Sequence, residues 1–206
     1  MKGVFITFEG AEGSGKSTQA RMVHSYLKRK KIPVLFIREP GGVKISEVIR
    51  RLLLDVKNEE MTKVCETLLY MAARSQLVEE KILPALKEGK VVLSDRFLDS
   101  TIVYQGYGNG VNMDFIRRMG YIVTQGRQPD LTLLFDLPAE KGLSRTGKVK
   151  DRIERRSLHY HNRVRQGYLK LARREPGRIK VIRVNKGKKG IQEMVRPYVD
   201  AWLKRR

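Results

Sequence analysis

One stretch near the N-terminus has the residue types and the spacing that bind a chain of phosphate groups. Residues 10–17 match G-x-x-x-x-G-K-[ST], with an apolar run before them and a helical pattern after them. Glycines allow a tight turn whose backbone N–H groups face phosphate oxygens, and the N-terminus of the next helix adds partial positive charge. The motif therefore predicts a nucleoside triphosphate site at Gly10, Ala11, Glu12, Gly13, Ser14, Gly15, Lys16, Ser17 and Thr18.

Several side chains in and near this loop suit a bound triphosphate and its metal ion. Lys16 would reach the β- and γ-phosphates, and the Ser17 hydroxyl would bind Mg²⁺. Glu12 is unusual in a phosphate loop because its charge repels the anion, so we expect it to serve the metal or a sugar hydroxyl. Asp95 follows an apolar strand, where an acid either positions Mg²⁺ through water or orients the neighbouring Arg96. The sequence leaves both roles of Asp95 open.

Four arginines indicate a second substrate that carries a phosphate group. Arg38 and Arg96 follow apolar strands, whereas Arg50 and Arg74 lie on helical stretches. A guanidinium group pairs with phosphate through two parallel hydrogen bonds. One arginine at a strand end is often only a surface ion-pair partner, but we expect these four to converge on one cleft.

Apolar runs alternate with helical patterns along the chain, which predicts an α/β fold. Strands are expected at residues 4–8, 34–37, 91–93, 131–136 and 179–184. Such runs are typical of a five-stranded parallel sheet covered by helices on both faces. Ligands of these folds bind at the carboxyl ends of the strands, where the phosphate loop and the arginines would meet. We expect residues 1–206 to form a single domain, with a short basic lid at about 141–156.

The helical stretches carry expectations about burial. The helix at 45–54 is expected to turn four apolar side chains inward: Val48, Ile49, Leu52 and Leu53. A long helix at 62–86, with a kink or early end at Pro84, would bury Val64, Leu68, Met71, Ala72 and Leu83. Cys65 is expected to be a small core residue. Residues 106–110 are expected to be a mobile connector that breaks a helix starting near Asp99.

The composition narrows the class of protein. The net charge is 43 − 22 = +21, and residues 141–190 hold 18 Lys and Arg against three acids. This charge suits polyanionic partners, or a solvated Lys- and Arg-rich surface as in some heat-adapted proteins. The single cysteine excludes an internal disulfide. The sequence contains no run of 18 apolar residues, so we expect no membrane span. Because the first residues enter a strand directly, we expect no signal peptide and a cytoplasmic location.

An ordered set of motifs resembles the thymidylate kinase family over almost the full length of the chain. The matching pieces are the phosphate loop with its flanks at 8–19, Arg-Glu-Pro-Gly-Gly at 38–42, Arg50 before Leu-Leu-Leu-Asp at 52–55, Tyr-Met-Ala-Ala-Arg at 70–74, Asp-Arg-Phe at 95–97, Ser-Thr at 100–101, Tyr-Gln-Gly at 104–106, Pro-Asp-Leu at 129–131 and Asp-Arg-Ile-Glu at 151–154. The resemblance implies a P-loop nucleoside monophosphate kinase fold, ATP-dependent phosphorylation of dTMP to dTDP with Mg²⁺, and a homodimer.

The resemblance also implies roles for individual residues. Arg74 would meet the thymine edge, and the ring of Tyr70, where family members usually have Phe, would stack on the base. Thr101 would lie near the base, and Tyr104 would lie under the sugar and disfavour a ribose 2′-hydroxyl. Arg50 and Arg96 would hold the acceptor phosphate. The complete expected dTMP site is Arg38, Pro40, Arg50, Tyr70, Arg74, Arg96, Ser100, Thr101, Tyr104 and Gln105.

In the reaction that the resemblance implies, the acceptor would be a phosphate oxygen that is ionised at pH 7, so no strong general base would be needed. Catalysis would rest on in-line positioning and charge neutralisation. The loop offers no basic residue before Lys16, so the resemblance is to the bacterial type, in which the lid supplies an arginine. The candidates are Arg145, Lys148, Lys150, Arg152, Arg155 and Arg156. We expect Arg152 to be the catalytic cation of the lid, with Arg145 as the second candidate. The other expected catalytic residues are Lys16, Glu12 and Arg96.

Two other functions compete with this interpretation. The first is another nucleoside or nucleotide kinase with a related cleft, which a panel of dTMP, dUMP, dCMP and AMP would separate. The second is a P-loop module whose basic half binds nucleic acid, with hydrolysis as a switch. It predicts tight, salt-sensitive binding to DNA or RNA, but the sequence holds no recognised nucleic-acid motif.

Overall fold

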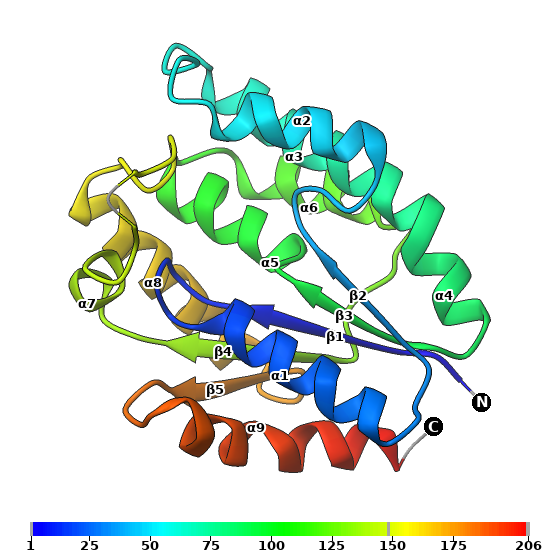
Figure 1. Ribbon diagram of the computed structural model, residues 1–206. Coiled ribbons are helices and arrows are strands. Elements are labelled where there is room, and N and C mark those ends of the chain that lie inside the picture. The colour runs from blue at the N-terminus through cyan, green and yellow to red at the C-terminus, as the bar shows by residue number, and fades with distance from the viewer. Residues whose placement is uncertain (1, 148, 205–206) are drawn as a thin grey trace.

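The computed structural model describes residues 2–147 and 149–204 and has a parallel sheet at its centre (Figure 1). The strands lie in the order β2-β3-β1-β4-β5, and each neighbouring pair is parallel. Their bounds are Val4–Glu9 (β1), Val34–Arg38 (β2), Val91–Asp95 (β3), Leu131–Asp136 (β4) and Ile179–Arg183 (β5). The predicted five-stranded parallel sheet is confirmed.

Helices cover both faces of this sheet (Figure 1). One face carries α1 and α9, and the other carries the α3–α4 segment, η2 and α8. The bounds are Lys16–Arg29 (α1), Lys44–Leu54 (α2), Lys63–Leu77 (α3), Val78–Ile82 (η1, a π-helix), Leu83–Lys87 (α4), Leu98–Thr101 (α5), Ile102–Gly108 (η2, a π-helix), Met113–Val123 (α6), Ala139–Leu143 (α7), Leu158–Arg174 (α8) and Lys188–Leu203 (α9).

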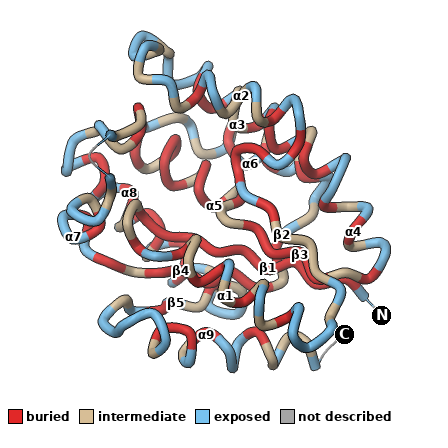
Figure 2. The backbone as a smooth tube through the Cα atoms, in the orientation of Figure 1, coloured by how far each residue is buried: buried red, intermediate tan, exposed pale blue. Residues whose placement is uncertain are grey.

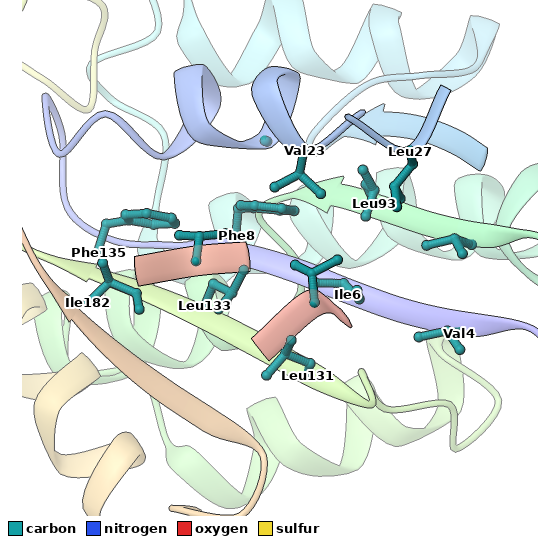
Figure 3. Packing of buried hydrophobic residues seen from close by; sticks show 14 of the residues in the cluster. Val4, Ile6, Phe8, Val23, Leu27, Leu93, Leu131, Leu133, Phe135 and Ile182 are labelled. Carbon is teal, nitrogen blue, oxygen red and sulfur yellow. The ribbon is translucent and has the colours of Figure 1, made fainter. Parts of the chain in front are cut away.

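The core follows from the alternation of side chains along the central strand. Ile6 and Phe8 of β1 pack against Val23 and Leu27 of α1, as the close view in Figure 3 shows, whereas Phe5 points to the other face. The three central strands, β3, β1 and β4, are accordingly buried along almost their whole length, whereas the edge strands β2 and β5 are only partly buried. Exposed residues lie on the outer sides of the helices and in the connecting loops (Figure 2). Burying a side chain of this size contributes roughly 1.5–3 kcal/mol, so these clusters fix the sheet whose edge carries the site.

The predicted long helix is present but contains a π-helical turn. It runs as α3, η1 and α4, and Pro84 lies at the start of α4. Proline has no N–H to donate, and the wider turn before it accommodates that loss, so the chain continues in helical form instead of ending. The segment ends before Gly89, whose φ is +75°.

The prediction of a mobile connector at residues 106–110 is wrong. The helix that begins at α5 continues through η2 to Gly108. A Cβ added to Gly106 would lie 2.4 Å from the sulfur of Met113, and one added to Gly108 would lie 2.6 Å from the ring of Tyr160. These glycines therefore permit close packing against α6 and α8 and do not break the helix.

The predicted burial of the apolar side chains on the helices from 45 to 86 is wrong for Val48, Leu52, Val64, Leu68 and Ala72, and Ile49 and Leu83 are half-buried. Together with Ile45, four of these form a set of five apolar side chains of α2 and α3 that are exposed by two fifths or more of their surface: Ile45, Val48, Leu52, Val64 and Leu68. Cys65 and Ala72 are exposed as well, whereas Leu53 and Met71 are buried as predicted. We call the five exposed side chains the α2–α3 apolar face. Within residues 2–147 and 149–204, each helix is too short or too polar to cross a membrane.

Candidate active site

A cleft of about 320 Å³ opens at the carboxyl ends of β1, β2 and β3. The phosphate loop contributes Glu12, Lys16 and Ser17 to its wall, and β3 contributes Asp95. The structure brings the entire expected acceptor site into this one cleft: Arg38, Pro40, Arg50, Tyr70, Arg74, Arg96, Ser100, Thr101, Tyr104 and Gln105. The convergence of four arginines that the sequence suggested is therefore present.

A second hollow, of about 560 Å³, lies along the other side of the phosphate loop. Residues 13–19 line it together with Arg145, Lys186 and Lys188. Glu12, Lys16 and Ser17 line both hollows, so these three side chains stand where the two meet. A donor in one hollow and an acceptor in the other would face each other across Lys16.

The phosphate loop owes its shape to two close backbone contacts. Gly13 has a φ of +66°, and a Cβ there would lie 2.0 Å from the carbonyl oxygen of Gly142 in α7. A Cβ on Gly142 would in turn lie 2.2 Å from the carbonyl oxygen of Glu12. The loop and the base of the predicted lid can touch only because both positions lack a side chain.

Lys16 is buried, with its Nζ 3.4 Å from the Ala11 carbonyl oxygen and 3.9 Å from Glu12 Oε2. Burial lowers the pKa of Lys16, and the nearby Arg96 lowers it further, while Glu12 acts in the opposite direction. A phosphate group placed here would restore favourable surroundings for the ammonium charge.

Arg96 sits in the left-handed region at φ +72°, which directs its side chain back over the phosphate loop. Its Nη2 donates to Glu12 Oε1 at 2.7 Å and to the Tyr104 hydroxyl at 3.1 Å. Burial alone would raise the pKa of Glu12, but Arg96 and Lys16 outweigh it and lower that pKa to about 2. Glu12 is therefore a carboxylate, and Arg96 a fixed cation, over the whole working range of pH.

A buried polar group lies behind Arg96. Glu9, at the end of β1, accepts hydrogen bonds from the Phe97 N–H at 2.7 Å, the Ser100 hydroxyl at 2.6 Å and the Tyr168 hydroxyl at 2.7 Å. Burial, with the charge of Asp99, raises the pKa of Glu9 to about 7, and Arg96 and the two hydroxyls offset this only in part. The hydrogen bonds from Phe97 and Ser100 to Glu9 hold the turn that carries Arg96.

Arg74 is almost fully buried at 2% exposure and is held by Glu39, the acid of the Arg-Glu-Pro motif. Arg74 Nε donates to Glu39 Oε2 at 2.8 Å, and Nη2 donates to the Phe97 carbonyl oxygen at 3.2 Å. The guanidinium group is thereby pre-positioned in the wall of the cleft.

Arg38 and Arg50 converge on a single acceptor, the Pro40 carbonyl oxygen, at 3.0 and 2.9 Å. Arg38 also pairs with Glu47 at 3.0 Å. Burial lowers the pKa of Arg50, and the charge of Arg38 lowers it further. Two cations held this close favour an anion in the cleft beside them.

The predicted lid, at about 141–156, contributes the acids Asp151 and Glu154 to the cleft, but not Arg152, the arginine expected to be its catalytic cation. Asp151, Ile153 and Glu154 line it, whereas Arg152 pairs with Glu66 at 2.6 Å and is 96% buried. Arg145 is exposed at the second hollow. Arg156 also pairs with Glu66, at 3.2 Å, and Arg155 lies 3.8 Å from Glu59. Lys150 is half-buried, and Lys148 lies outside the described residues. The role of each lid cation stays a prediction.

The oxygen groups expected to hold a metal lie together. Ser17, Glu12 and Asp95 all line the first cleft, the one expected to hold the acceptor and called the acceptor cleft below. Among the described residues, no group of three His, Cys, Asp or Glu side chains forms a ready-made metal site. A hydroxyl and a carboxylate beside phosphate oxygens form a donor set that suits Mg²⁺, which is bound by few protein ligands.

Several residues of the site escaped the sequence analysis as site residues. Glu9 and Glu39 stand at strand ends, where an acid is a usable signal. Tyr168 belongs to α8 and lies 159 positions from Glu9 in the sequence. Glu66 has the sequence pattern of any acid in the first turn of a helix. Only the fold brings the last two to the site.

The chain is similar to thymidylate kinases over most of its length. A sequence model of the family described as thymidylate kinase matches residues 8–195. A thymidylate kinase of Symbiobacterium thermophilum is 48% identical over 204 residues, which cover 98% of this chain and 95% of that protein. A thymidylate kinase of Thermoanaerobacter sp. is 45% identical, covering 97% and 96%. The crystal structure of thymidylate kinase from Ehrlichia chaffeensis has a TM-score of 0.80 at 31% identity and covers 97% of this chain and 99% of that one.

Proposed function

Because the chain belongs to the thymidylate kinase family, we propose that it transfers the γ-phosphoryl group of ATP to the phosphate of dTMP, giving dTDP and ADP. One observation carries the proposal for this chain: the expected acceptor residues all line a single cleft that meets the phosphate loop at Lys16. The continuous sheet and its shared cores support our proposal that residues 1–206 form one kinase domain. A cytoplasmic location remains our prediction.

The acceptor would be held at both ends. Arg74, fixed by Glu39, would meet the thymine edge, and Tyr70 would stack on the ring; both line the cleft. Arg96 and Arg50 would bind the acceptor phosphate, with Arg38 beside them. The Tyr104 ring, already fixed by its hydroxyl on Arg96 and Glu12, would lie where a ribose 2′-hydroxyl would collide.

The donor would occupy the second hollow, with its phosphates along the loop. Lys16, at the junction of the two hollows, would neutralise charge on the transferring group. Mg²⁺, when bound by Ser17 and assisted by Asp95 and Glu12, would neutralise phosphate charge. The chain's own part is to align the acceptor oxygen with the γ-phosphorus and to exclude water from that line.

We also propose a homodimer built on the α2–α3 apolar face. Ile45, Val48 and Leu52 lie three and four positions apart on α2, so they form one stripe, and Val64 and Leu68 extend it on α3. Side chains of this kind are rarely left exposed as a group on a monomer. A two-fold axis would place the same stripe on both sides of the contact.

A coupled assay with ATP, Mg²⁺ and a panel of dTMP, dUMP, dCMP and AMP tests the activity. We expect the highest kcat/KM with dTMP. A preference for another monophosphate would replace the proposal with a related nucleotide kinase.

A further inference from the structure

Glu66, near the start of α3, is a carboxylate with no exposed surface and a complete set of partners. Its Oε1 accepts from Gln105 Nε2 at 2.9 Å and from Asn109 Nδ2 at 2.8 Å. Its Oε2 pairs with Arg152 Nη1 at 2.6 Å and with Arg156 Nη2 at 3.2 Å. A buried charge is tolerated only when it is paired this thoroughly, so the arrangement of these donors is specific.

The partners of Glu66 come from two parts of the molecule that must cooperate in the site. Gln105 belongs to η2 and lines the acceptor cleft, whereas Arg152 and Arg156 belong to the lid. Arg152 is further tied to the end of α2, since its Nε donates to the Leu53 carbonyl oxygen at 2.8 Å. Glu66 thus joins α3, the acceptor wall and the lid.

Side chains in this part of the lid divide between two directions. Asp151, Ile153 and Glu154 line the acceptor cleft, whereas Arg152 and Arg156 reach Glu66. Holding the two arginines therefore sets where the cleft-lining side chains stand.

We propose that Glu66 is a positioning residue that fixes residues 151–156 of the lid over the acceptor cleft, with Arg152 as its anchor. This inference rests on the proposed function for its catalytic consequences. Arg152 then does not meet the transferring phosphoryl group, and that role falls to the N-terminal half of the lid, where Arg145 lines the donor hollow.

Two variants test the anchor from its two sides. Glu66→Gln keeps an oxygen for Gln105 and Asn109 but places an amide where the arginines need an anion. Arg152→Met removes the lid's side of the pair and leaves Glu66 paired with Arg156. Glu59→Gln is the matched control, because Glu59 is an exposed acid beside Arg155 of the same lid segment.

We expect both test variants to raise KM for dTMP by about tenfold or more and to raise KM for ATP by much less, since the displaced segment lines the acceptor cleft. The double variant should be little worse than either single one, because both break the same interaction. Glu59→Gln should match the parent. A loss of about 10²-fold in kcat for Arg152→Met, with KM for dTMP unchanged and Glu66→Gln normal, would overturn the proposal and make Arg152 the catalytic cation.

Limited trypsin digestion of the substrate-free protein provides a readout independent of activity. Cleavage after Arg155 and Arg156 should be about tenfold faster in Glu66→Gln than in the parent or in Glu59→Gln, at a temperature where all remain folded. Equal rates in all three proteins would contradict the anchor. Because this measurement needs no substrate, it separates failure of the anchor from failure of the proposed kinase activity.

Discussion

Glu12 Oε1 lies 2.7 Å from Arg96 Nη2, so an acid of the phosphate loop is paired with the arginine that stands in the acceptor cleft. The other oxygen of Glu12 lies 3.9 Å from Lys16 Nζ. The carboxylate therefore bridges a cation expected to serve the acceptor and a cation expected to serve the donor. This position accounts for an acid in a loop that binds anions: the negative charge lets two cations stand close together before any phosphate arrives.

Replacing Glu12 by Gln should impair the acceptor side more than the donor side. The variant keeps the size of the side chain but removes the charge that holds Arg96 and accepts from Tyr104 at 2.8 Å. Hydrogen bonds to charged groups contribute about 1.5–3 kcal/mol, so we expect kcat/KM for dTMP to fall by roughly 10- to 100-fold. Steady-state kinetics with each substrate varied in turn measures this.

Glu193→Gln, which changes an exposed acid on α9, is the control for the altered net charge. An unchanged kcat/KM in Glu12→Gln would show that the ion pair with Arg96 has no part in catalysis.

Glu9 should make the stability of the protein depend on pH near neutrality. Burial raises its pKa from 4.5 to about 7, so the folded state binds the proton more tightly than the unfolded chain. This contribution to stability is complete below about pH 4.5 and is lost as the pH rises through about 7. Urea unfolding at a series of pH values should therefore show a decline over this range that Glu9→Gln lacks. Parallel curves for the two proteins would contradict the raised pKa.

The fold could be predicted from the sequence because its signals are local. Each strand is a short apolar run, and the phosphate-loop motif predicts a strand before it and a helix after it. The carboxyl ends of neighbouring parallel strands must meet at one edge, so Arg38, Asp95 and Arg96 could be placed together without knowing any distance.

The features that could not be predicted from the sequence depend on which distant residue packs against a given side chain in the folded protein. Helical periodicity shows that Leu52 and Leu68 share an apolar stripe with their neighbours, but not whether the protein's own core or another surface covers it. Gly106 and Gly108 suggest a helix break in the sequence, but in the structure they allow Met113 and Tyr160 to pack closely against the helix. The direction of Arg152 depends on Glu66, 86 positions away in the sequence and recognisable only once α3 faces the lid.

Removing the partner of Arg74 should be costly for the stability of the protein. Glu39 and Arg74 are both nearly inaccessible, with exposures of 3% and 2% for their side chains. Glu39→Ala would leave a buried guanidinium group without a counter-charge, for which we expect a loss of about 3–5 kcal/mol in the free energy of unfolding. Urea denaturation measures the change. Glu59→Ala, which removes the exposed partner of Arg155, is the matched control and should cost less than about 1 kcal/mol.

The two parts of Tyr104 should have separable effects. Its hydroxyl contacts Arg96 and Glu12, and its ring lies 4.9 Å from the Arg96 guanidinium group. Tyr104→Phe should lower kcat/KM for dTMP by about tenfold through the lost hydrogen bonds. It should still reject the ribonucleotide analogue of dTMP, because the ring remains. Tyr104→Ala should accept that analogue better relative to dTMP. If Tyr104→Phe relaxed the discrimination as much as Tyr104→Ala, the ring would not be the excluding group.

A charge on the α2–α3 apolar face should dissociate the proposed dimer. Leu52 is 47% exposed and lies in the stripe with Val48 and Ile45, so a carboxylate there would be buried against its symmetry mate. We expect Leu52→Glu to be a monomer by light scattering at concentrations where the parent is a dimer. Tyr198→Glu is the control, since Tyr198 is 38% exposed on α9, at the other side of the sheet from α2 (Figure 1).

Cys65 offers a second measurement of the same contact, because it is exposed on α3 next to Val64 of the apolar face. In the dimer its thiol should be shielded, so a thiol reagent should label it more slowly in the parent than in Leu52→Glu. Tyr198→Glu should label at the parent's rate. A parent that is monomeric, or a Leu52→Glu variant that remains a dimer with unchanged labelling, would exclude this face as the interface.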